Sequence, residues 1–241
     1  MAATHLQLNC DLGEISAELD RKLMPFIDQA NIACGGHAGD QHSMLNCIEL
    51  ADQYGVAIGA HPSYPDRSNF GRQSMSIDLD KLEQSLFEQV ASLQALCQRR
   101  GVTLRHIKAH GALYNDSNKD PALLALLVQL ARDFNCALML QSLPINDKAE
   151  RLGAEHGVEL IYETFADRAY SKSGLLVPRT QNGAVHEQLS IIVEQALGFA
   201  QHGCVRSIDD HILKLRADSL CVHGDSNTAL LAVRAIYDAL H

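Results

Sequence analysis

Short apolar runs alternate along the chain with longer stretches of helical apolar spacing. We expect strands at seven places: residues 5–11, 30–34, 57–61, 104–109, 137–141, 159–165 and 219–223. Between them the apolar residues recur three or four positions apart, most clearly in residues 78–100. Strands that alternate with helices are typical of a mainly parallel sheet, because parallel neighbours need a crossover connection.

Local sequence signals predict where two of the helices lie. Asp120 followed by Pro121 is a capping acid before a proline at the first helical position, so we expect a helix to begin there. The last helix is expected at about residues 229–240. No segment rich in Pro, Gly or Ser divides the chain, and we therefore expect a single domain over residues 1–241.

The composition excludes several classes of protein. With 241 residues, 46% of them hydrophobic, the chain can bury a full core, which excludes a disordered or disulfide-scaffold protein. A net charge of −9 argues against nucleic-acid binding. No apolar run approaches the length of a membrane span, and the first residues do not resemble a signal peptide. The seven cysteines form no C-x-x-C pair and are expected to be buried and reduced. We expect a cytoplasmic protein.

Polar residues follow the ends of nearly all the expected strands. In chain order they are Asn9, Asp11 and Glu14; His37 and Asp40; His61; Lys108, His110 and Asn115; Glu163, Asp167 and Arg168; and His223 and Asp225. In an open sheet such residues would gather at one crevice, whereas a ring of strands directs them all to a common mouth. This distribution predicts an α/β fold, an irregular seven-stranded (β/α) barrel related to the TIM barrel.

Each of these residues also has a simpler interpretation. Asp40 and Asp225 precede expected helices and could serve only as N-caps, and a single buried histidine is more often part of the core than catalytic. Lys108 is harder to explain in this way, because it would lie inside the barrel and lysine is rarely buried without a partner. Its position predicts facing carboxylates or an anionic substrate.

Several catalytic motifs are absent from the sequence. It contains no G-x-x-x-x-G-K-[ST] phosphate loop, no G-x-G-x-x-G turn, no G-x-S-x-G elbow and no H-E-x-x-H helix. The remaining carboxylates, imidazoles and one ammonium suit general acid–base attack on a carbonyl, or a metal-assisted version of it.

Six segments, in order, resemble motifs of the LamB/YcsF family: residues 9–14, 30–40, 58–62, 108–115, 165–168 and 221–225. The resemblance spans nearly the whole chain. The sequence departs from the family pattern at Gly36, where Phe is usual, and at Gln41 and Ala109, where Pro is usual.

The resemblance implies a barrel like that of glycoside hydrolases and carbohydrate deacetylases. It also implies ATP-dependent hydrolysis of 5-oxo-L-proline (pyroglutamate) to L-glutamate, performed together with two partner subunits, B and C. Phosphorylation of the lactam oxygen would give an activated imidate that water can attack. Because this chain lacks a phosphate loop, we expect the partners to bind most of the ATP.

The expected catalytic residues are Asp11, His61, Lys108, His110 and His223. Asp11 or His61 would activate water, His110 or His223 would protonate the leaving nitrogen, and Lys108 would offset negative charge. Substrate binding is expected at Asn9, Glu14, His37, Asp40, Asn115, Glu163, Asp167, Arg168 and Asp225; among these, Asn9 and Asn115 would orient the ring, and Glu163 and Asp225 would hold the imidazoles.

Two alternatives remain open at this point. The first is a metal-dependent amidohydrolase or deacetylase on the same barrel, with Asp11, His37 and His61 as possible ligands. The second is a non-catalytic ligand-binding subunit that regulates its partners.

Overall fold

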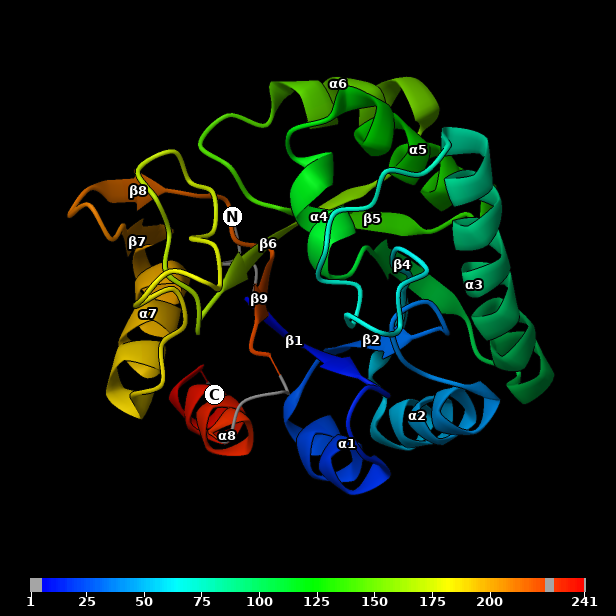
Figure 1. The fold of residues 1–241 in the computed structure, drawn as a ribbon. Coiled ribbons are helices and arrows are strands. Elements are labelled where there is room, and N and C mark those ends of the chain that lie inside the picture. Colours follow the sequence, from blue (N-terminus) through cyan, green and yellow to red (C-terminus); the bar gives the residue numbers. More distant parts are fainter. Residues whose placement is uncertain (1–5, 224–227, 241) are drawn as a thin grey trace.

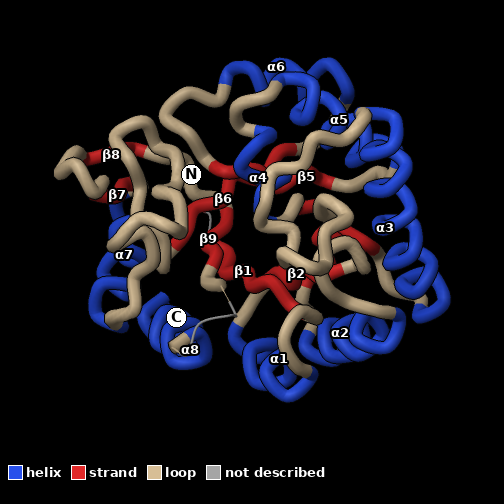
Figure 2. The backbone as a smooth tube through the Cα atoms, viewed as in Figure 1, coloured by secondary structure: helices blue, strands red, loops and turns tan. Residues whose placement is uncertain are grey.

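Seven parallel strands close into a barrel in the order β1-β2-β3-β4-β5-β6-β9, surrounded by helices (Figures 1 and 2). The computed structural model describes residues 6–223 and 228–240. The barrel strands are β1 (Gln7–Leu12), β2 (Gln29–Ala33), β3 (Ala57–His61), β4 (Leu104–Lys108), β5 (Ala137–Gln141), β6 (Leu160–Phe165) and β9 (Ser219–Cys221). The expected seven-stranded α/β barrel is confirmed.

Each expected strand corresponds to one strand of the barrel, and the expected bounds of β3 and β5 are those observed. The sequence did not predict β7 (Cys204–Arg206) and β8 (Ile212–Lys214), which form an antiparallel pair outside the barrel. Both are only three residues long, which is too short for a periodic signal.

The helices surround the barrel, with α4 lying closer to its centre than the others (Figure 2). They are α1 (Ala17–Leu23), the 3-10 helix η1 (Met24–Phe26), α2 (Gln41–Tyr54), α3 (Leu79–Arg100), α4 (Gly111–Ser117), α5 (Pro121–Asp133), α6 (Asp147–His156), α7 (Leu189–His202) and α8 (Ala229–Leu240). Helix α5 begins where its proline predicted, with the Asp120 side chain accepting a hydrogen bond from the Ala122 backbone N–H. Helix α8 has the expected bounds.

The apolar faces of the helices pack on the barrel. On α3, the residues with helical spacing, from Leu82 to Cys97, are buried. All seven cysteines lie outside any disulfide, and six are buried, with Cys204 partly exposed, which confirms the expected burial of the other six. Among the described residues, no helix is both long and apolar enough to cross a membrane.

The interior of the barrel is polar at its centre. A chain of hydrogen bonds runs from Ser219 Oγ to Gln29 (2.6 Å), from the Asn9 amide to Ser219 (2.7 Å) and from the Asn31 amide to Asn9 (2.8 Å). The His106 ring continues it by donating from Nε2 to Asn31 Oδ1 at 2.8 Å. Because these side chains satisfy one another, they form a rigid floor beneath the carboxyl ends of the strands.

Candidate active site

A cavity of about 1000 Å³ opens at the carboxyl end of the barrel. The structure brings together around it eight of the residues expected from the sequence: Asp11, Glu14, His61, Lys108, His110, Asn115, Arg168 and His223. They come from loops and strand ends far apart in the chain, as expected for a barrel in which every strand ends at the same mouth.

Lys108 lies at the base of this cavity between two carboxylates. Its Nζ is 2.9 Å from Asp11 Oδ1 and 2.7 Å from Glu163 Oε1. Burial alone would lower the pKa of Lys108, but Asp11 and Glu163 outweigh it and raise that pKa well above its ordinary value. The facing carboxylates predicted from the position of Lys108 are therefore present.

Glu163 has a different role from the one expected. Its second oxygen accepts a hydrogen bond from the hydroxyl of Tyr114 at 2.6 Å, so this carboxylate holds Lys108 and Tyr114 and not an imidazole. Asp11 is equally occupied, since Oδ1 accepts from Lys108 and from the Asn31 amide, and Oδ2 lies 3.3 Å from His61 Nε2.

An Asp–His pair forms a second part of the site. His223 Nδ1 lies 3.0 Å from both oxygens of Asp167, which also accepts the His223 backbone N–H at 3.2 Å. Burial would raise the pKa of Asp167, but the nearby His223 outweighs it and lowers that pKa. An ionised carboxylate only accepts, so Nδ1 carries the hydrogen and Nε2 is left to exchange a proton.

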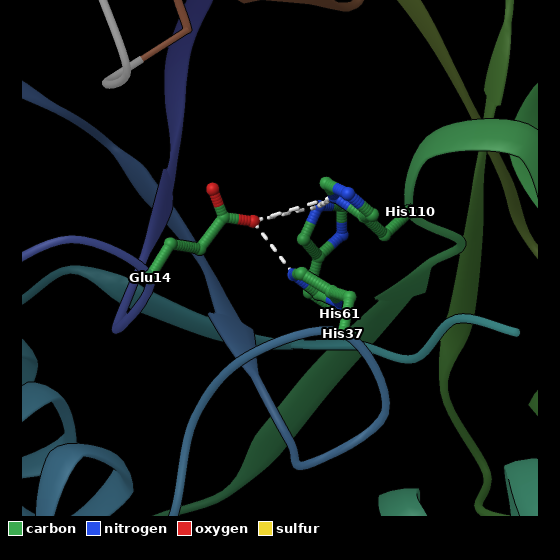
Figure 3. A group of neighbouring side chains, drawn as sticks. All are labelled: Glu14, His37, His61 and His110. Atoms are coloured by element: carbon green, nitrogen blue, oxygen red, sulfur yellow. Dashed lines mark hydrogen bonds and ion pairs between the residues drawn. The ribbon is translucent and has the colours of Figure 1, made fainter. Parts of the chain in front are cut away.

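Three imidazoles and one carboxylate form the third part (Figure 3). One oxygen of Glu14 points at all three rings: Oε1 is 2.8 Å from His37 Nε2, 3.3 Å from His110 Nδ1 and 3.8 Å from His61 Nε2. His61 Nε2 and His110 Nδ1 are themselves 3.0 Å apart. Of the ligands expected if a metal is bound, His37 and His61 belong to this cluster, whereas Asp11 falls in a separate group with Cys221 and His223.

Asn115 lines the cavity, but its amide donates to the Gly111 carbonyl within α4. The remaining expected residues lie elsewhere, and Asn9 belongs to the buried floor. Asp40 is exposed and forms a capping box with Ser43 at the start of α2, which supports its simpler interpretation as an N-cap. Asp225 lies outside the described residues.

The sequence was compared with known protein families, and the LamB/YcsF family model matches residues 6–241. The chain belongs to the LamB/YcsF family. Members with curated names include the 5-oxoprolinase A subunit of Pseudomonas fluorescens (strain Pf0-1), 43% identical over 99% of this chain and 98% of the relative. The protein of the same name from Vibrio cholerae (strain M66-2) is 40% identical over 100% of this chain and 99% of the relative.

A solved structure supports the same relationship. The lactam utilization protein from Thermus thermophilus superposes with a TM-score of 0.87 at 33% identity, over 98% of this chain and 95% of that one. The LamB/YcsF relationship and the barrel topology therefore agree.

In this LamB/YcsF chain, sequence reasoning missed the loop residues of the cavity. Arg72, Lys119 and Arg179 line it and place positive charge around its mouth. Arg168, which was expected, donates to the carbonyls of Ala184 and Val177 and so fastens the loop after β6. Isolated basic residues in loops give no periodic signal, so only the fold shows that they converge.

The loop after β3 is also part of the site. The carbonyl of Phe70 accepts a hydrogen bond from His110 Nε2 at 3.0 Å. The next residue, Gly71, has a φ of 62°, and a Cβ there would be 3.0 Å from the Cβ of His37 and 3.2 Å from the His110 ring. Glycine at this position lets the backbone close over the two histidines. In the sequence, the turn-forming residues Asp66, Ser68 and Asn69 were the signal that could have indicated an ordered loop here.

Proposed function

We propose that this chain is the A subunit of an ATP-dependent 5-oxoprolinase, which hydrolyses 5-oxo-L-proline to L-glutamate as ATP is hydrolysed to ADP and phosphate. The observation that carries the proposal is that relatives named as the A subunit of 5-oxoprolinase match the chain over almost its full length. The name of the Thermus protein, which refers to lactam use, agrees with a cyclic amide as the substrate class.

The chemistry of the substrate fits the groups in the cavity. A five-membered lactam is a stable amide with a poor leaving group, so its carbonyl must be activated before water attacks. Phosphorylation of the carbonyl oxygen by ATP supplies that activation. The positive side chains at the mouth, Arg72, Lys119 and Arg179, suit the negative charge that the phosphoryl group adds.

The Asp167–His223 pair is the best candidate for proton transfer. With Nδ1 held by Asp167, the His223 Nε2 can take a proton from the attacking water and return it to the ring nitrogen as the C–N bond breaks. This leaves an acyl phosphate, which a second water hydrolyses to glutamate and phosphate. Asp11 is a poorer base than expected from the sequence, because Lys108 and the Asn31 amide both donate to its Oδ1, and the neighbouring His61 and Lys108 hold its pKa well below the ordinary value despite burial. It is better suited to holding Lys108 and His61 in place.

The proposal divides the work between subunits. This chain contributes the cavity and the ring-opening groups, and subunits B and C contribute most of the ATP site, since the sequence has no phosphate loop. We place the complex in the cytoplasm, because seven free thiols without a disulfide suit a reducing compartment.

The test is glutamate release from 5-oxoproline by the chain alone and with subunits B and C, each with and without ATP. Glutamate only when all three proteins and ATP are present is the expected result. No glutamate from an assembled, folded complex would refute the proposal. Release by this chain alone without ATP would instead favour a metal-dependent amidohydrolase. Unchanged turnover in a complex with substituted cavity residues would favour a non-catalytic binding subunit.

A further inference from the structure

The tautomers of His61 and His110 are set by backbone carbonyls. His61 Nδ1 lies 2.8 Å from the carbonyl of Lys108, and His110 Nε2 lies 3.0 Å from the carbonyl of Phe70. A carbonyl oxygen only accepts, so each of these nitrogens carries the hydrogen. In the neutral form of each ring the other nitrogen, His61 Nε2 or His110 Nδ1, presents a lone pair.

These two lone pairs face each other. The nitrogens are 3.0 Å apart, and Glu14 Oε1 lies 3.3 Å from His110 Nδ1 and 3.8 Å from His61 Nε2. Three electron-rich atoms at this spacing repel one another unless a proton or a metal cation lies between them. For a tetrahedral Zn²⁺ with bonds of about 2.0–2.1 Å, neighbouring ligand atoms are about 3.3 Å apart. The observed separations bracket that value.

The hydrogen bonds that His61 and His110 donate to backbone carbonyls are typical of histidines that bind a metal. A ligating histidine almost always donates its other N–H to a carbonyl or carboxylate, which fixes the ring and its tautomer. Both His61 and His110 do so, and the two rings are nearly perpendicular at 88°.

His37 differs from them in two ways. Its ring stacks on that of His110, with centroids 3.6 Å apart and planes within 3°. A histidine nitrogen binds a metal in the plane of its ring, and one ion cannot lie in both of two stacked, parallel planes. Its Nδ1 is buried and has no hydrogen-bond partner. If Nε2 bound a metal, Nδ1 would carry a buried hydrogen with no acceptor, which is costly. If Nε2–H instead donates to Glu14 at 2.8 Å, Nδ1 carries no hydrogen.

The three ligand residues, Glu14, His61 and His110, line the cavity, whereas His37 does not. Three protein ligands with one open position are typical of catalytic zinc sites, where the fourth position takes a water or a substrate oxygen.

We propose that Glu14, His61 and His110 bind one divalent transition-metal ion of the Zn²⁺ type, and that His37 orients Glu14 without being a ligand. This site goes beyond the proposed function and does not depend on it. The other candidate group, Asp11, Cys221 and His223, is less suitable because the Lys108 ammonium lies 2.9 Å from Asp11 and 3.4 Å from Cys221 Sγ. That positive charge opposes a second cation.

The experiment is a titration of the chelator-treated, purified chain with Co²⁺, followed by its visible ligand-field absorption, and with Zn²⁺ by calorimetry. We expect one ion per chain and the intense absorption of a four-coordinate Co²⁺ site. Neither subunits B and C nor ATP is present, so a failure of this proposal is distinguishable from a failure of the proposed function.

Four variants test the ligand set. Glu14→Gln and His110→Gln should each weaken binding more than His37→Gln, whose loss should be roughly 10–100-fold, the range for residues that support a ligand. His223→Gln should bind as the wild type does. Glu14→Gln keeps the size of the side chain, so it remains informative if a histidine variant fails to fold, as checked by circular dichroism.

Three results would overturn the proposal. The first is that the wild-type chain takes up no Co²⁺ or Zn²⁺. The second is an equal loss in His37→Gln and His110→Gln, because His37 would then be a ligand. The third is a loss in His223→Gln with none in Glu14→Gln, which would place the ion in the other group.

Discussion

The ammonium of Lys108 and the carboxylate of Glu163 are 2.7 Å apart, with side chains only 3% and 0% exposed. They come from β4 and β6, which are separated in the barrel by β5. The ion pair therefore crosses the barrel interior, and Asp11 from β1 joins it from a third direction. Each charge is compensated only while the others remain in place.

Lys108→Met should destabilise the protein strongly. It leaves Asp11 and Glu163 buried without their cation, and breaking a buried pair in this way costs about 3–5 kcal/mol. Chemical unfolding followed by circular dichroism measures the free energy. The control is Lys22→Met, because Lys22 pairs with Glu18 on the exposed surface of α1 and should contribute less than about 1 kcal/mol. Equal losses in the two variants would contradict the buried-pair interpretation.

Asp167→Asn should lower turnover of the reconstituted complex by roughly 100-fold or more, the range for loss of positioned proton transfer. The amide cannot hold the His223 tautomer as the carboxylate does, while the side chain keeps its size. Glutamate release at saturating 5-oxoproline and ATP is the measurement. Asp210→Asn, on the exposed pair with Arg206, is the matched control and should retain activity. Full activity in Asp167→Asn would remove the Asp167–His223 pair from the mechanism.

The strands and the mouth of the barrel could be predicted from the sequence because their signals are local. Short apolar runs located β3 and β5, and the Asp120–Pro121 pair located the start of α5. Parallel strands necessarily direct their carboxyl ends to one side, so the polar residues that follow them were expected to converge there.

The partners within the site could not be predicted in the same way. Glu163 contacts Lys108 because β5 pairs with both neighbours in a particular register, with Met139 opposite Lys108 and Gln141 opposite Glu163. Register and closure depend on the packing of the whole barrel. Local sequence allowed Asp40 to be either an N-cap or a site residue and could not decide between them, and it could not show that Glu14, on a short loop, reaches three histidines.

Acid should destabilise the protein through His106. Burial, followed by the charges of Lys108 and His61, lowers the pKa of His106 from 6.5 to about 3. Between these values the unfolded chain binds a proton that the folded chain does not, so stability falls as the pH is lowered below about 6.5. Over the whole window the loss is on the order of 5 kcal/mol.

The measurement is the free energy of unfolding at pH 7 and at pH 5 for the wild type and for His106→Gln. His106→Gln lacks the titrating ring. Between pH 7 and pH 5 its free energy of unfolding should therefore decrease by about 2 kcal/mol less than that of the wild type. Comparing the two proteins separates His106 from the other groups that titrate in this range. Parallel pH dependences would show that His106 does not hold the depressed pKa.

Gly59→Ala should destabilise the barrel from inside. Gly59 of β3 lies opposite His106 of β4, at an irregularity in the strand register. A Cβ at position 59 would overlap the His106 ring, which is fixed by its hydrogen bond to Asn31. Forcing an extra carbon into a packed interior costs typically about 1–3 kcal/mol.

The loss of stability should be much smaller in a His106→Ala background, where the ring is absent. Unfolding free energies of the wild type, the two single variants and the double variant give the coupling between the two positions. Equal losses in both backgrounds would show that the glycine is required for the strand backbone and not for the space that His106 occupies.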